Sequence, residues 1–224
     1  MKDLIEYPDA DMMMLDLANT IAGSLEMNLQ THETASLCVP GGTTPGPIFD
    51  SLCAADLDWA RVTIMLSDER WVPESSPRSN TALLMHRLCV GRAAAAKIAP
   101  LYMQTDTPED ALGELIEGLK PALPISVLLL GMGADMHTAS LFPGADQLDA
   151  ALRDDAPALM AMRAPGAPEP RITLTAPVLA GAMETHIVII GDEKREALER
   201  AKHLSPQAAP VSVVLPNATV HWAP

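Results

Sequence analysis

Short apolar runs recur along this chain, and each is almost uninterrupted by polar residues. The clearest are residues 35–39, 62–66, 125–130 and 187–190. A strand that is apolar along its whole length, and not only at every second residue, is typical of a parallel sheet covered on both faces. Segments with helical spacing separate these runs. The sequence therefore predicts an α/β fold with a mostly parallel sheet and helices on both faces.

The segments between the apolar runs carry helix signals. Within residues 9–29, apolar side chains return every four positions. Thr107 and Pro108 have the character of an N-cap and a first helical residue, and Ser79 with Asn80 precedes another helix in the same way. We expect helices over residues 9–29, 48–55, 82–89, 111–119, 174–183 and 192–202, further strands over 98–102 and 157–162, and two apolar segments, 211–215 and 218–222, at the end of the chain.

Composition limits the class of protein. The chain has 224 residues, of which 48% are hydrophobic and 3% are aromatic. That content is enough for a sizeable core, and we expect a single α/β domain over residues 1–224. The formal net charge of −14 argues against a nucleic-acid binder or a binder of anionic membranes. It is compatible with an anionic small molecule, because a few local cations dominate the field at short range.

Several features favour a cytoplasmic protein. The three cysteines, Cys38, Cys53 and Cys89, form no CxxC pair, and their odd number argues against a disulfide framework. The N-terminus has no basic region followed by a long apolar run, so we expect no signal peptide. The longest apolar runs are too short to span a membrane. For the oligomeric state, we expect a monomer or a weak homodimer.

Polar or glycine-rich sequence follows directly after several of the predicted strands. The segments are PGGTTPG at 40–46, SDERW at 67–71, GMGADMH at 131–137 and GDEK at 191–194. In open α/β sheets, ligands bind beyond the carboxyl ends of the strands, where segments of this kind meet. Their convergence predicts a ligand site at that edge of the sheet.

The segment PGGTTPG has the composition of a phosphate cradle. Gly41 and Gly42 allow backbone N–H groups to approach an anion, while Thr43 and Thr44 add hydroxyl donors just before a helix. The segment is neither a P-loop nor a GxGxxG motif. An ordinary tight turn has the same composition, so this stretch alone leaves both interpretations open.

The segments GMGADMH and SDERW contribute acid–base and cationic groups. Asp135 can orient the imidazole of His137, which can then accept a proton from water. Arg70 can face an anionic or carbonyl group while a neighbouring acid, Asp68 or Glu69, holds it in place. The alternatives are a loop histidine without a role and a solvated charged turn. Two further cations have the same pair of interpretations, site residue or surface residue: Arg171 and Lys194.

Taken in order, these segments resemble the 6-phosphogluconolactonases, within the glucosamine-6-phosphate isomerase/deaminase superfamily. The resemblance covers residues 35–222. Its most specific part is LGMG-x-D-x-HTASLFPG, and the second is SDER followed by SN. The matching segments are VPGGTTPGPIFDSL, SDERWVPESSPRSNTALL, LLLGMGADMHTASLFPG, PEPRITLT and IVIIGDEKREALERA.

The resemblance implies a Rossmann-like sheet and hydrolysis of 6-phospho-D-glucono-1,5-lactone to 6-phospho-D-gluconate in the oxidative pentose phosphate pathway, without a cofactor. By position, the catalytic histidine of the family falls on His137, its partner aspartate on Asp135, and the arginine of its DER motif on Arg70. The residues implied to bind the substrate and its phosphate are Gly41, Gly42, Thr43, Asp68, Arg171 and Lys194.

The chain departs from the family at one position. The family usually has Asp-Gly-His where this chain has Asp135, Met136 and His137. Glycine often marks a left-handed backbone angle that costs other residues on the order of 1–2 kcal/mol. We expect that the loop either does not need that angle or tolerates the strain.

Other functions are compatible with parts of the sequence. An aldose–ketose isomerase or deaminase would need a carboxylate such as Asp68 to move a proton between carbons, but such relatives resemble Asp-Glu-Tyr where this chain has Arg70. A regulator that binds sugar phosphates without catalysis is a further alternative. Ser140 near His137 would permit a covalent route, although no GxSxG is present. The scattered histidines show no metal-binding spacing, so we expect no metal site.

Overall fold

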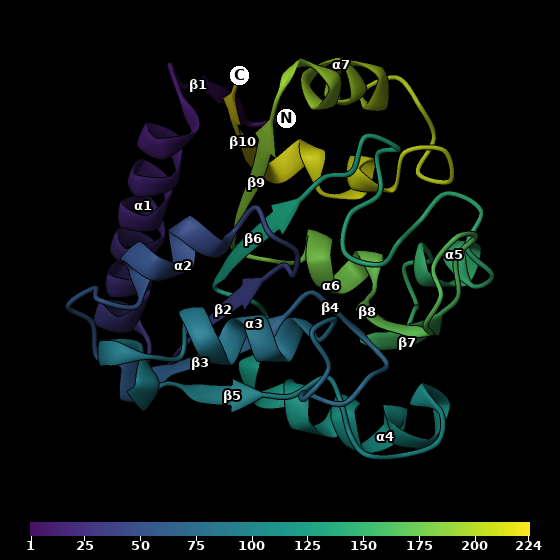
Figure 1. The fold of residues 1–224 in the computed structure, drawn as a ribbon, viewed down its shortest axis with the longest axis horizontal. Helices are drawn as coiled ribbons and strands as arrows, with labels where there is room; N and C mark the ends of the chain where they lie inside the picture. The colour runs from purple at the N-terminus through teal and green to yellow at the C-terminus, as the bar shows by residue number, and fades with distance from the viewer.

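The computed structural model describes residues 1–224 and contains two sheets (Figure 1). The larger sheet has seven strands, all parallel. In spatial order its strands are β1 (Asp3–Glu6), β10 (Ala218–Ala223), β9 (Glu184–Ile190), β6 (Val127–Gly131), β2 (Ala35–Val39), β3 (Val62–Leu66) and β5 (Lys97–Ala99). The smaller, antiparallel sheet has the order β4 (Asp68–Arg70), β8 (Arg171–Leu174) and β7 (Leu159–Met162).

Helices flank the large sheet. Helix α1 packs against α2 and against strands β2, β6 and β10, while α4 packs against β7 of the small sheet. Figure 1 shows α1 and α2 to the left of the large sheet and the small sheet with α4, α5 and α6 to its right. The helices are α1 (Ala10–Thr31), α2 (Gly46–Leu52), α3 (Asn80–Arg87), α4 (Pro108–Leu119), α5 (Leu148–Ala151), α6 (Ala176–Ala180) and α7 (Asp192–Ala201), with short 3₁₀ turns at Trp59–Arg61, Gly91–Ala95, Lys120–Ala122, Pro210–Val213 and Leu215–Asn217.

The apolar runs identified in the sequence form the centre of the structure. Strands β2, β3, β6 and β9 are buried almost throughout, and their side chains belong to one continuous hydrophobic cluster. Burial on both faces explains why these strands are apolar at successive positions. The predicted α/β fold with a parallel sheet is confirmed, and so are the caps, because Ser79 accepts a hydrogen bond from Ala82 and Thr107 forms a capping box with Asp110. No helix is long and apolar enough to cross a membrane.

One local prediction was wrong, and several strands were missed. Residues 68–70, for which a charged turn was one alternative, form strand β4, which pairs with β8. The helix expected over residues 174–183 covers only Ala176–Ala180, because Leu174 ends strand β8 and Pro177 lies in the first helical turn, where a proline fits. The polar-flanked strand β1 was missed; it pairs with β10 at the edge of the sheet.

The order of the strands determines where a ligand can bind. From β2 the chain runs outward to β3 and β5, and it then returns to β6 on the other side of β2 before continuing to β9 and β10. The connections that leave β2 and β6 therefore diverge at their carboxyl ends. A crevice at such a switch point is the usual ligand site of open α/β sheets.

Candidate active site

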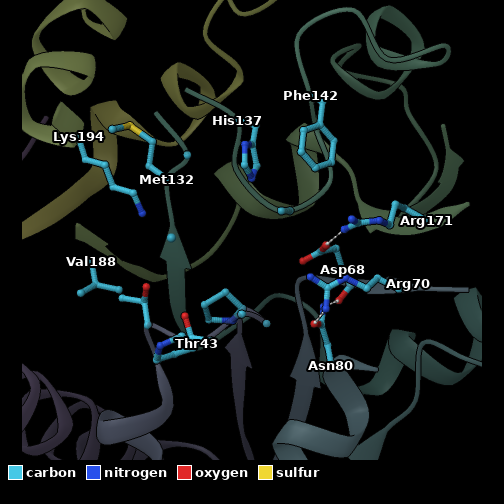
Figure 2. Close-up of a pocket in the computed structure, with 18 residues that line it drawn as sticks. Thr43, Asp68, Arg70, Asn80, Met132, His137, Phe142, Arg171, Val188 and Lys194 are labelled. Atoms are coloured by element: carbon cyan, nitrogen blue, oxygen red, sulfur yellow. Dashed lines mark hydrogen bonds and ion pairs between the residues drawn. The ribbon is translucent and has the colours of Figure 1, made fainter. Parts of the chain in front are cut away.

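A cavity of about 400 Å³ lies at this switch point, beyond the carboxyl ends of β2 and β6 (Figure 2). It brings together residues from every polar strand end noted in the sequence. All the predicted site residues line it except Asp135, which lies behind His137. The lining residues are Pro40, Gly41, Gly42, Thr43, Thr44, Pro45, Asp68, Arg70, Asn80, Gly131, Met132, Gly133, His137, Ala139, Phe142, Arg171, Val188 and Lys194.

The imidazole of His137 is held from two directions. Its Nδ1–H donates to Asp135 Oδ1 at 2.5 Å, and this carboxylate also accepts from the His137 backbone N–H at 3.2 Å. The ring packs against Phe142 with the centroids 4.3 Å apart. An ionised carboxylate can only accept, so a neutral imidazole in this contact carries its proton on Nδ1 and has its lone pair on Nε2. His137 lines the cavity, so a ligand bound there can reach this ring.

Gly133 is required for this arrangement. A Cβ atom at Gly133 would collide with the His137 ring and with the carboxylate of Asp135. Its N–H donates to the carbonyl of His137 at 3.0 Å, and its carbonyl accepts from Met136 N–H at 2.9 Å. The loop therefore closes on itself with the imidazole and the carboxylate packed over the glycine.

Met136 occupies the left-handed region of the backbone, with φ = 66°, as does Ala139 with φ = 49°. The loop thus keeps the angle that a glycine would adopt freely, at a cost on the order of 1–2 kcal/mol. The carbonyl of Met136 accepts from Val211 N–H at 3.1 Å, and its side chain packs against the core. Of the two expectations for this position, tolerated strain is the correct one.

Asp68 is a buried carboxylate whose two oxygens both have hydroxyl donors. Ser67 Oγ donates to Oδ1 at 3.0 Å, and Ser140 Oγ donates to Oδ2 at 2.6 Å. Arg171 Nη1 lies 3.8 Å from Oδ2. Ser140 has no exposed surface. Its hydroxyl therefore positions Asp68 and is not accessible to a substrate. This burial argues against the covalent route through Ser140.

Two arginines face each other on neighbouring strands of the small sheet. Arg70 of β4 lies directly opposite Arg171 of β8, a pairing of like charges that destabilises a sheet. Burial lowers the pKa of the Arg171 guanidinium, although the nearby Asp68 carboxylate raises it in part. The Nε atoms of both arginines are buried without a hydrogen-bond acceptor. An anion bound in the cavity would offset the repulsion between the two guanidinium groups and would supply the acceptor that their Nε atoms lack.

The glycine loop offers unused donors on another wall of the cavity. The backbone N–H groups of Gly41, Gly42 and Thr43 have no acceptor within the chain. Gly42 has φ = 83°, a left-handed angle that turns the loop toward helix α2. Lys194 reaches the cavity from the first turn of α7 and forms no ion pair. Figure 2 shows Lys194 and Thr43 on one side of the cavity and the two arginines on the other.

Sequence reasoning missed the contributions of Glu69, Asn80 and Phe142. Glu69 has no exposed surface, and its carboxylate accepts from the backbone N–H groups of Asn80 at 2.8 Å and Thr81 at 2.6 Å. It therefore fixes the N-terminus of α3 to strand β4. The spacing from SDER to SN does not indicate that Asp68 faces the cavity and that Glu69 faces helix α3. Nowhere do three or more His, Cys, Asp or Glu side chains form a group that could hold a metal ion.

The chain is similar to known proteins over almost its whole length. The sequence model of the glucosamine-6-phosphate isomerases/6-phosphogluconolactonase family matches residues 8–222. The chain belongs to this family. Within it, the chain is 39% identical to the 6-phosphogluconolactonase of Rhizobium meliloti over 93% of both chains. It is also 39% identical to the 6-phosphogluconolactonase of Pseudomonas aeruginosa, over 93% of this chain and 89% of the relative.

Solved structures show the same fold. The crystal structure of a 6-phosphogluconolactonase from Shewanella baltica superposes with a TM-score of 0.96 and 30% identity, covering 100% of this chain and 98% of the other. A monomeric glucosamine-6-phosphate deaminase superposes with a TM-score of 0.79 at 16% identity, over 100% of this chain and 97% of the other, which is a likeness of fold alone. The resemblance to 6-phosphogluconolactonases inferred from the sequence is confirmed.

Proposed function

We propose that this protein hydrolyses 6-phospho-D-glucono-1,5-lactone to 6-phospho-D-gluconate, a reaction of the oxidative pentose phosphate pathway. One observation carries the proposal: a single cavity holds an imidazole oriented by a carboxylate together with unpaired cationic and amide donors. A phosphorylated lactone needs both sets, because its phosphate must be neutralised and its ester carbonyl must be attacked by water. The similarity to curated 6-phosphogluconolactonases supports the same substrate.

The phosphate of the substrate binds to the glycine loop. The free N–H groups of Gly41, Gly42 and Thr43 supply the donors, Lys194 supplies charge on the same side of the cavity as Thr43, and Arg171 supplies charge from the facing side (Figure 2). Backbone amides and cations of this kind are the usual ligands of phosphate in α/β proteins. Binding in this position leaves the sugar ring in the part of the cavity that His137 faces.

His137 acts as the general base. Nε2 removes a proton from a water molecule as the water oxygen forms a bond to C1 of the lactone, and Asp135 stabilises the resulting imidazolium through Nδ1–H. The bond between C1 and the ring oxygen then breaks, and His137 returns the proton to that oxygen as it becomes the C5 hydroxyl. One water is consumed, and the product is the open-chain acid.

Arg70 supplies positive charge across the cavity from Thr43 and Lys194 (Figure 2). It orients the lactone, and it stabilises the negative charge that grows on the carbonyl oxygen during attack. Asp68 accepts hydroxyl hydrogen bonds from Ser67 and Ser140 and lies beside Arg171, so its role is to position that guanidinium. Arg70 disfavours the deaminase alternative, because relatives with that activity resemble Asp-Glu-Tyr at this place.

The test is an initial-rate assay on freshly prepared 6-phosphogluconolactone, with the spontaneous hydrolysis measured in parallel and subtracted. We expect release of 6-phosphogluconate well above that background, and no ammonia from glucosamine 6-phosphate. Lactone turnover at the spontaneous rate, or ammonia release from the amino sugar, would contradict the proposal.

A further inference from the structure

Asn80, the first residue of helix α3, lies where the glycine loop, strand β4 and the cavity meet. We propose that Asn80 is a positioning residue that couples the phosphate-binding loop to Arg70, so that both are correctly placed only when its carboxamide is present. This inference rests on the proposed function, because it assigns the residue a role in binding the phosphorylated substrate.

Hydrogen bonds to Glu69 fix the backbone position of Asn80. Its N–H donates to Glu69 Oε1 at 2.8 Å, and Ser79, the N-cap of α3, donates its hydroxyl to Glu69 Oε2 at 3.2 Å. Only 3% of the residue is exposed to solvent. A side chain on so rigid a backbone has little freedom, so its contacts are determined by the fold.

The carboxamide of Asn80 makes a different contact with each of its two polar atoms. Nδ2 donates to the backbone carbonyl of Asp68 at 3.0 Å, and Oδ1 accepts from Arg70 Nη1 at 3.3 Å. Because a carbonyl can only accept and a guanidinium can only donate, these neighbours decide which end of the amide is oxygen. Asparagine satisfies both, whereas aspartate would place an oxygen against the carbonyl of Asp68.

The same carboxamide packs flat against Gly41. A Cβ atom at Gly41 would collide with Oδ1, Cγ and Nδ2 of Asn80. The glycine loop and the amide therefore fit together only because Gly41 has no side chain. Through this contact on one side and Arg70 on the other, one residue sets the distance between the loop that binds phosphate and the arginine that orients the lactone.

The experiment compares Asn80→Ala and Asn80→Asp with wild type, and uses Asn28→Ala as a matched control. Asn28 lies in α1, does not line the cavity, and loses a bond of the same kind, from Nδ2 to the Ser24 carbonyl at 2.8 Å. The measurements are kcat and KM for 6-phosphogluconolactone, the dissociation constant of 6-phosphogluconate by calorimetry, and the melting temperature of each protein.

We expect Asn80→Ala to raise KM and the dissociation constant by about 5- to 20-fold, because a hydrogen bond to a charged group is lost at the binding site. We expect kcat to fall by a smaller factor, about 2- to 5-fold, because Arg70 remains in the cavity and keeps its hydrogen bond to the Arg78 carbonyl. Asn80→Asp should weaken binding further, since its negative charge neutralises Arg70. Asn28→Ala should change the melting temperature only.

The outcomes separate this inference from the proposed function. If wild type turns over the lactone and folded Asn80 variants bind 6-phosphogluconate within about twofold of wild type, the inference is wrong while the function stands. If wild type binds 6-phosphogluconate without turnover and the variants bind it more weakly, the function is wrong while the inference stands. Loss of folding in both Asn80 variants would also overturn the inference, because it would assign the residue to the fold.

Discussion

The protein contains two pairs of imidazole and carboxylate that are alike in geometry and different in surroundings. In the cavity, His137 Nδ1 lies 2.5 Å from Asp135 Oδ1, and the side chains are 31% and 54% exposed. In the sheet, His186 Nε2 lies 2.9 Å from Glu184 Oε1, but the histidine side chain is only 4% exposed. A close contact between a histidine and an acid is therefore no sign of catalysis by itself; access to a ligand distinguishes the two.

The buried pair continues into a chain of hydrogen bonds that ties several elements together. His186 Nδ1 lies 3.0 Å from His221 Nε2, whose Nδ1 lies 3.0 Å from the hydroxyl of Tyr7. Tyr7 in turn donates to Asp16 Oδ2 at 2.6 Å. The chain links strands β9 and β10 to the segment after β1 and to helix α1. Every nitrogen of these two rings has a partner, so neither is left to accept a proton from substrate.

Replacement of His137 by alanine should have the largest effect on activity. We expect kcat to fall about 10²- to 10⁴-fold, the usual contribution of a general base, while the free energy of unfolding stays close to wild type because the ring is partly exposed. Steady-state kinetics and urea unfolding of the same preparation check both parts. If the variant loses activity only because it is unfolded, His137 has a structural role like that of the buried pair, and the prediction is wrong.

Replacement of His221 by alanine should have the opposite consequence. The change leaves a cavity and unpairs the hydrogen-bonding groups of Tyr7 and His186, so we expect about 2–4 kcal/mol of destabilisation. Activity per folded molecule should not change. The check is the urea midpoint together with kcat/KM at a temperature where the variant is folded, and a selective loss of kcat would contradict the structural role.

The carboxylates of the two pairs provide a matched comparison. Asp135→Asn should lower kcat by about 10- to 100-fold, because an amide can no longer stabilise the imidazolium through a charged hydrogen bond. Glu184→Gln, the same chemical change in the buried pair, should leave kcat unaltered. Equal effects of the two substitutions on turnover would show that the cavity is not what distinguishes them.

The chain of hydrogen bonds that contains the buried pair should also make stability depend on pH, through His221. Burial, and secondarily the charge of His186, lowers the pKa of His221 from 6.5 to about 4. Between these values the unfolded chain binds a proton that the folded protein excludes, so stability falls as pH falls through this window. We expect a loss of roughly 1 kcal/mol between pH 6.5 and about pH 5.5. Urea midpoints measured across this pH range check that stability falls as pH falls. The His221→Asn variant is the control and should not show this dependence.

Met136→Gly should have the smallest effect. Glycine removes the left-handed strain but loses the packing of the methionine side chain, so we expect a net change in stability within about 1 kcal/mol. The catalytic rate should stay within about threefold of wild type, because Asp135 and His137 are unchanged. A large gain or loss in kcat would mean that the strain at Met136 positions the base.

Much of the site could be predicted because its residues follow apolar strands. Segments after β2, β3, β6 and β9 meet at one edge of the sheet, so Arg70, His137 and Lys194 line one cavity as expected. The central strands could be predicted because both of their faces are buried, which makes their sequences almost continuously apolar.

Strand β7 was expected within residues 157–162, but its pairing into a small antiparallel sheet could not be predicted, and neither could the different roles of Asp68 and Glu69. Strand β4 is three residues long and pairs with β8, far along the chain, so no local pattern marks it. Whether Asp68 or Glu69 faces the cavity depends on that pairing. The left-handed angle of Met136 could not be decided from the sequence, because tertiary contacts hold this residue in a conformation that methionine does not prefer.

Rescue of the His137→Ala variant by added imidazole is the most direct test of the catalytic pair. If the imidazole ring in the cavity is the base, the rate of lactone hydrolysis by this variant should rise with imidazole concentration, beyond the rise in an enzyme-free control. The His221→Ala variant should show no such response. A His137→Ala variant that hydrolyses the lactone at the wild-type rate, or that binds 6-phosphogluconate normally yet gains nothing from imidazole, would contradict the assignment of His137 as the base.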